Sequence, residues 1–148
     1  MQDLSLHILD IVENAIRAGA DKIIIEISED AGKDQLIVDI KDNGLGMDSK
    51  TIKKAADPFF TTKEKRKFGL GLSLFSQAVE QAGGSIKIKS KKGVGTKITA
   101  VFKLSHPDMK PKGDILGTIG ALVAANPKIQ VIYNYRKGDY NYFFDSFK

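Results

Sequence analysis

In the stretch Leu36–Asp48, LIVDIKDNGLGMD, an alternating apolar run stops at Asp-Asn and passes into Gly-x-Gly. Alternating β-branched residues are typical of a half-buried strand, and Asn-Gly often closes a β-hairpin. No second alternating run follows at hairpin distance, since MDSKTIKKAADPFF predicts a short helix and then a loop. The turn therefore leads away from the strand, and its glycines allow a close approach to the backbone.

The composition is that of one globular domain without disulfide bonds. The chain has 148 residues, a net charge of +5, two histidines and no cysteine. A chain of this length buries roughly 70% of its unfolded surface, and without cysteine it forms neither disulfides nor thiolate metal sites. Any bound metal is therefore expected to have oxygen ligands.

The start of the chain does not resemble a secretory signal, and no apolar run approaches the ~20 residues of a membrane span. A cytoplasmic location is therefore expected, and contact with a membrane is not.

Positive charge is concentrated in two segments. Residues 50–67 contain seven Lys or Arg, and residues 83–105 contain six lysines and no acid. Such a balance favours a polyanion or an acidic partner. In SIKIKSKK, however, lysines alternate with isoleucines, as in a strand with one solvated face. Because aromatic residues are not interleaved with these lysines, nucleic acid is not expected as a binding partner.

Periodicity and turn residues predict alternating helices and strands. Helices are expected over 4–18, 48–56, 70–83 and 113–125, and strands over 22–29, 34–42, 85–92, 95–105, 128–135 and 139–147. The predicted fold class is α+β, a two-layer α/β sandwich with the helices on one face of a mainly antiparallel sheet.

Three places in this pattern could carry chemistry. Asp10 and Asn14 lie one helical turn apart, so a carboxylate and an amide oxygen could hold hydrated Mg²⁺, or the carboxylate could accept a proton from water. A satisfied core amide is the alternative for Asn14. Gly69 and Gly71 open a helix, where free amide donors favour an anion. Thr96 begins a strand after a third glycine turn.

Taken in order over residues 4–104, five segments resemble the motifs of the GHKL ATPase superfamily, which contains gyrase B, the ninety-kilodalton heat-shock chaperones, histidine kinases and MutL. The segments are DIVENAIRAGA, DNGLGMD, PFFTTK, FGLGLSLF and GVGT. The resemblance implies a Bergerat-type sandwich of helices on a mixed, mainly antiparallel sheet, ATP as the ligand, Mg²⁺ as the metal and a lid over the phosphates.

Position by position, the resemblance implies that Asn14 ligates Mg²⁺ and that Asp10 occupies the position of a general base that is often glutamate. It implies that Asp42 accepts a hydrogen bond from the adenine amine and that Gly44 and Gly46 let the base approach. It further implies base contacts for Met47 and Thr96, lid residues Phe60, Thr62 and Lys63, and phosphate contacts at Gly69, Leu70, Gly71 and Leu72. Lys63 is expected to touch phosphate and, with Asp10, to take part in catalysis.

Residues 1–106 are expected to form the ATP-binding core, and residues 107–148 a helix and β-hairpin that pack on or complete the same domain. The alternative for this tail is a surface that binds a partner. No dimerising hairpin precedes Asn14, so a complete histidine kinase is not expected. The resemblance favours a small stand-alone protein kinase, similar to anti-sigma factor serine kinases, that passes the γ-phosphoryl group of ATP to a partner protein. The alternatives are an ATP-hydrolysing conformational switch of the MutL or gyrase type and a module that only binds nucleotide. A homodimer stays open.

Overall fold

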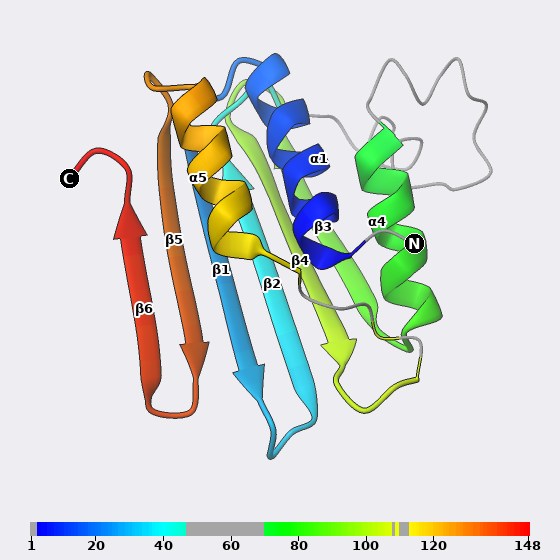
Figure 1. The fold of residues 1–148 in the computed structure, drawn as a ribbon. Coiled ribbons are helices and arrows are strands. Elements are labelled where there is room, and N and C mark those ends of the chain that lie inside the picture. Colours follow the sequence, from blue (N-terminus) through cyan, green and yellow to red (C-terminus); the bar gives the residue numbers. More distant parts are fainter. Residues whose placement is uncertain (1–2, 47–69, 108, 110–112) are drawn as a thin grey trace.

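A six-stranded sheet carries three helices on one face (Figure 1). The computed structural model describes residues 3–46, 70–107, 109 and 113–148. The helices are α1 (Leu4–Arg17), α4 (Leu70–Gln81) and α5 (Ile115–Ala125). The strands are β1 (Lys22–Asp30), β2 (Gln35–Asp42), β3 (Ser85–Lys91), β4 (Gly95–Lys103), β5 (Gln130–Lys137) and β6 (Tyr140–Asp145). The predicted α+β sandwich is confirmed.

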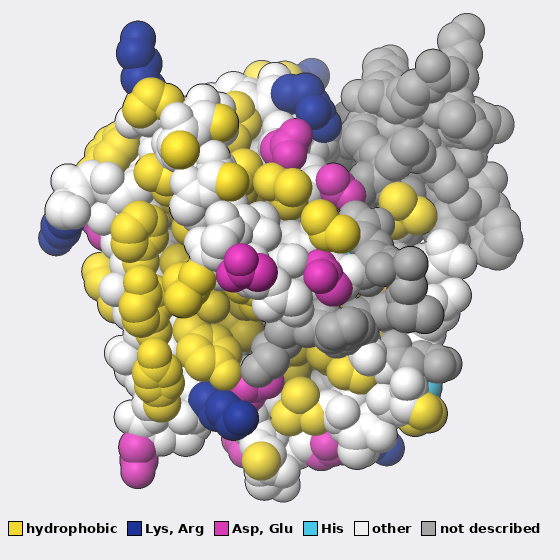
Figure 2. Space-filling model, in the orientation of Figure 1, with side chains coloured by type: hydrophobic (Ala, Val, Ile, Leu, Met, Phe, Trp, Pro, Cys, Tyr) yellow, Lys and Arg dark blue, Asp and Glu magenta, His cyan; other side chains and the backbone are white. Residues whose placement is uncertain are grey.

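The strand order in the sheet is β3-β4-β2-β1-β5-β6. Every neighbouring pair is antiparallel except β1 and β5, which are parallel, so the sheet is mixed as expected. Alternate residues of the inner strands point at the helices and are fully buried, among them Ile25, Val38 and Ala100. These side chains meet the apolar stripe of α1, which includes Ile8 and Val12. The core therefore lies between the two layers, and no described helix covers the opposite face of the sheet, which we call the open face. Figure 2 shows the helix-covered face in space-filling form.

Helix α1 has clear sequence signals at both ends. The Asp3 carboxylate accepts the Leu6 N–H at 3.0 Å and so caps the first turn. Gly19 follows the helix with a φ of +90°, the left-handed conformation that favours glycine. The predicted bounds of α1 and α4 are correct to within two residues. The short helix predicted over 48–56 lies outside the described residues.

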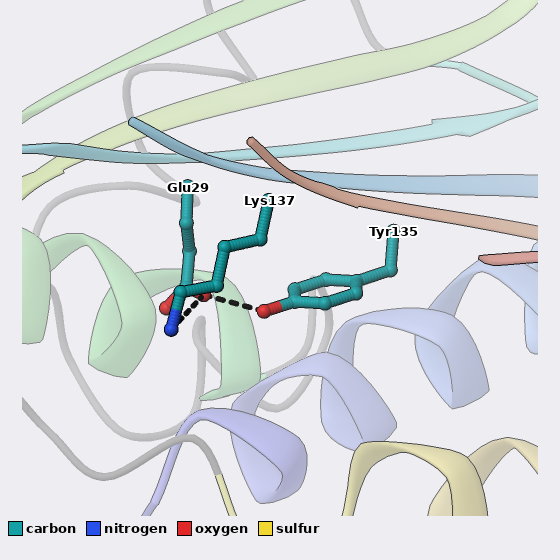
Figure 3. Close-up of polar contacts among 3 residues, drawn as sticks. All are labelled: Glu29, Tyr135 and Lys137. Carbon is teal, nitrogen blue, oxygen red and sulfur yellow. Dashed lines mark hydrogen bonds and ion pairs between the residues drawn. The ribbon is translucent and has the colours of Figure 1, made fainter. Parts of the chain in front are cut away.

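The segment after residue 113 joins the same sheet. β5 pairs with β1 along eight residues, from Lys22 opposite Gln130 to Glu29 opposite Lys137. Figure 3 shows the far end of this pairing, where Glu29 accepts a hydrogen bond from the Tyr135 hydroxyl and its carboxylate lies 3.9 Å from the Lys137 amine. Burial, with this hydrogen bond, raises the pKa of Tyr135 to about 12. Residues 135 and 137 thus provide a hydrogen bond and an ion pair to a buried carboxylate of β1. The division of the chain into two parts at residue 106 stays a prediction.

In the described part of the chain, no helix combines the length and the apolar character that crossing a bilayer requires.

Candidate functional site

The described residues among the predicted site residues come from three elements. α4 begins beside α1, and β2 ends at the same end of the sheet as α1 (Figure 1). α1 carries Asp10 and Asn14, β2 ends at Asp42, and α4 begins at Leu70. Five further predicted site residues, Met47, Phe60, Thr62, Lys63 and Gly69, lie outside the described residues.

Asp42 is the best defined of these side chains. It is half-buried on the helix face of the sheet, and its Oδ1 accepts the Gly44 N–H at 2.8 Å. Across the β2–β4 ladder it lies opposite Thr96, whose backbone N–H also donates to the carboxylate. Burial raises the pKa of Asp42, although both backbone donors act to lower it. A partly desolvated carboxylate of this kind is stabilised by one more hydrogen-bond donor.

The loop after Asp42 packs on the last turn of α1. The Leu45 N–H donates to the Ala18 carbonyl at 3.0 Å, and a Cβ at buried Gly44 would lie 3.3 Å from that oxygen and 3.4 Å from the Ala15 carbonyl oxygen. This contact fixes the position of Asp42 relative to the helix that carries Asn14.

Gly46 and Gly95 are required by contacts within the protein. Gly46 has a φ of +73°, and a Cβ there would lie 2.1 Å from the Lys91 carbonyl oxygen. A Cβ on Gly95 would lie 2.1 Å from the Asp42 carbonyl oxygen. These glycines therefore let the loop after β2 meet the turn between β3 and β4. The expected approach of a base to Gly44 and Gly46 stays a prediction.

Two residues that the sequence did not single out organise this end of the sheet. The Asn43 side-chain oxygen accepts the N–H groups of Asp21 and Lys22, each at 3.0 Å, and so ties the loop to the start of β1. The Ser90 hydroxyl lies 2.7 Å from the Thr96 hydroxyl and donates to the Gly95 carbonyl at 3.0 Å. The Asn-Gly pair hinted at the role of Asn43, whereas Ser90 comes next to Thr96 only through strand pairing.

Asp10 and Asn14 are both half-buried and lie one turn apart on α1. His7, one turn earlier, is buried against Phe75 with 5.6 Å between ring centroids, and so belongs to the packing of α1 against α4. Within the described ranges, no group of three or more His, Asp or Glu side chains could hold a metal. Proteins usually bind Mg²⁺ through one or two side-chain oxygens, and phosphate and water oxygens complete the coordination shell. The side-chain oxygens of Asp10 and Asn14 fit this coordination.

The first turn of α4 contains Leu70 and Gly71. Leu72 is only 5% exposed and belongs to the hydrophobic core, so it anchors the start of the helix.

Comparisons with known proteins agree with this geometry. Residues 2–106 match the family described as histidine kinase-, DNA gyrase B-, and HSP90-like ATPase. A Shewanella frigidimarina protein named for a sensor role is 38% identical over 109 residues, which are 72% of this chain and 17% of that protein. Sensor protein DegM of Bacillus sp. is 35% identical over 91 residues, 62% of this chain and 24% of DegM.

Among solved structures, the nucleotide-free catalytic domain of the histidine kinase ThkA is similar, with a TM-score of 0.54 and 25% sequence identity. The likeness covers 70% of this chain and 67% of that domain. The chain thus spans a small part of its two sensor relatives but most of one catalytic domain. It belongs to the histidine kinase-, DNA gyrase B- and HSP90-like ATPase family, as an ATP-binding domain of the histidine kinase type.

Proposed function

We propose that this chain binds Mg-ATP and passes the γ-phosphoryl group to a partner protein, acting as a small protein kinase in its own right. The observation that carries the proposal is the half-buried Asp42 carboxylate, held by the Gly44 N–H on the helix face of the sheet. An ionised carboxylate only accepts hydrogen bonds, so it suits adenine, whose exocyclic amine donates. Guanine offers a carbonyl acceptor at the same position and is disfavoured.

The polar strip of α1 supports the metal part of this proposal. Asn14 would hold Mg²⁺ through its side-chain oxygen, with Asp10 one turn earlier. When bound, the metal neutralises charge on the phosphates. The backbone N–H groups in the first turn of α4, at Leu70 and Gly71, would donate to phosphate oxygens, as helix N-termini commonly do.

The sequence motif supplies the remaining roles. Lys63 is proposed to neutralise charge on the γ-phosphoryl group during transfer, and Gly69 to bind phosphate with Leu70 and Gly71. Met47 and Thr96 are proposed to contact the base, and Phe60 and Thr62 to belong to the lid. A serine oxygen or histidine nitrogen of the partner forms the bond to the γ-phosphorus while the bond to the bridging β–γ oxygen breaks, and ADP leaves. With ATP as the substrate, the proposed compartment is the cytoplasm.

A second candidate function is an ATP-hydrolysing switch that controls a partner without phosphotransfer. The half-buried position of Asp10, one turn from Asn14, favours it, because a carboxylate there could accept a proton from an attacking water. In this case the product is free phosphate, and the partner responds to the closed form of the domain.

The two functions are separated by incubating the purified 148-residue chain with γ-labelled ATP and Mg²⁺, alone and with a cell lysate. Label on a lysate protein supports the kinase, and the Asn14→Ala variant should abolish the transfer. Free phosphate without labelled protein supports the switch, and Asp10→Asn should then abolish its release. GTP bound as tightly as ATP would contradict the role of Asp42.

A further inference from the structure

The open face of the sheet carries a cluster of lysines directly behind Asp42. Strand alternation places the side chains of Lys22, Lys41, Lys89, Lys91 and Lys97 on this face, and all five are exposed. They surround a shallow hollow of about 460 Å³ that is also lined by half-buried Ile24 and by Val94, which is 60% exposed. The described lining of the hollow thus combines five lysines with two aliphatic side chains.

Three of these lysines, Lys89, Lys97 and Lys41, form a line across the sheet that we call the lysine rung. Lys89 lies directly opposite Lys97, and Lys97 lies directly opposite Lys41. Like charges in directly opposed positions of neighbouring strands destabilise a sheet. None of the three enters an ion pair with any side chain that the structure describes. A solvated face requires polar side chains but not charges of one sign, so solvation alone does not account for the rung.

Acidic residues border the rung at the next position on the same face. Glu26 and Asp39 lie opposite each other in β1 and β2, and the Thr99 hydroxyl donates to Asp39. Their carboxylates would repel an anion that ran along the strands. An anionic ligand is therefore expected on the rung and on the side of it where Lys22 and Lys91 lie, away from these carboxylates. The rung spans two inter-strand spacings, roughly 10 Å, which an extended chain covers in about three residues.

We propose that this face binds a short acidic segment of a partner protein that carries an aliphatic side chain. Its carboxylates would lie along the lysine rung, and its aliphatic group would contact Ile24 or Val94 in the lining of the hollow. Nucleic acid fits less well, because no aromatic side chain among the residues that the structure describes lines the hollow for base stacking. The proposal does not rest on the kinase function, since it involves the opposite face of the sheet and requires no nucleotide.

The test uses the full chain and a fluorescein-labelled peptide, Glu-Glu-Leu-Glu-Glu-Leu-Glu-Glu, with binding followed by fluorescence anisotropy without nucleotide. The triple variant Lys41→Gln, Lys89→Gln, Lys97→Gln is expected to bind about tenfold more weakly, since each exposed charge pair contributes modestly. The matched control Lys33→Gln, Lys103→Gln, Lys128→Gln removes the same charge from exposed positions outside the hollow and should bind like the wild type. A peptide with glutamine in place of glutamate should not bind.

A second measurement guards against misfolding of the triple variant. Because it relieves repulsion between opposed lysines, its melting temperature at low salt should equal or exceed that of the wild type. Equal weakening in the two triple variants would overturn the proposal, because binding would then depend only on net charge. Tighter binding of labelled oligo-dT or of phosphatidylserine vesicles than of the peptide, with the same dependence on the rung, would also overturn it.

Discussion

Replacing Asp42 by asparagine leaves one acceptor oxygen at this position in place of two. The side-chain oxygen of asparagine can still accept the Gly44 N–H, which now lies 2.8 Å from Oδ1. The loop should therefore keep its position. The second oxygen becomes an NH₂ group, which donates and cannot accept from the adenine amine.

The size of the effect follows from the surroundings of Asp42. Hydrogen bonds to a charged group contribute about 1.5–3 kcal/mol. Because Asp42 is only half-buried, water weakens the contact and the lower part of this range applies. We expect a loss of about 1.5–2 kcal/mol, which is roughly a 10- to 30-fold increase in the Kd for ATP. The variant should fold with nearly unchanged stability, since it also removes a partly desolvated charge.

The assay is isothermal titration of Mg-ATP and of Mg-GTP into the wild type and two variants. Asp39→Asn is the matched control, because Asp39 is a half-buried carboxylate in the same strand whose side chain lies on the opposite face and accepts from Thr99. It should bind ATP like the wild type. If Asp42→Asn binds ATP within about twofold of the wild type, or if Asp39→Asn loses as much affinity, then Asp42 does not recognise the base.

Acidification should weaken ATP binding at pH values above the ordinary aspartate pKa of 3.8, because burial raises the pKa of Asp42. Once protonated, the Asp42 carboxyl loses the negative charge that accepts the adenine amine. Binding titrations at several pH values should show this loss of affinity in the wild type but not in Asp42→Asn. Asn14→Ala should abolish Mg-dependent ATP binding while the circular dichroism spectrum stays unchanged, and normal binding would remove Asn14 from the site. Gly46→Ala should lower the free energy of unfolding in urea by about 1–3 kcal/mol, because φ is +73° and the new Cβ meets a carbonyl oxygen at 2.1 Å. Gly120→Ala, in open space on α5, should instead raise it by up to about 1 kcal/mol. Deleting residues 107–148 should give an unstable chain by thermal denaturation, since β1 loses its pairing with β5; a folded fragment that still binds ATP would indicate that the tail is a partner surface instead.

Local sequence signals were sufficient for the helices and strands that the structure describes. The alternation of lysine and isoleucine in β3 appears as alternating exposed and half-buried residues. Glycine ended α1 and α4 with positive φ at Gly19 and Gly83. These features depend only on residues a few positions apart, which is why the sequence could predict them.

Burial was harder to predict for single polar side chains. His7 lies on the same strip of α1 as Asp10, yet it is 4% exposed and packs against Phe75. The reason is the packing of α1 against α4, which places Phe75 of α4 against His7. Helical spacing shows which residues share a face but not which neighbour covers it.

Local sequence patterns were therefore sufficient to predict the helices and strands, the family resemblance and the residues with suitable chemistry. Which distant residues contact one another depends on the tertiary structure. Strand register brings Asp42 beside Thr96, makes the glycines at 46 and 95 necessary for contacts within the protein, and aligns the lysines of three strands on the open face. The parallel pairing of β5 with β1 also depends on residues far apart in the chain. Local periodicity sets how each segment folds, whereas register depends on how all the buried faces pack at once.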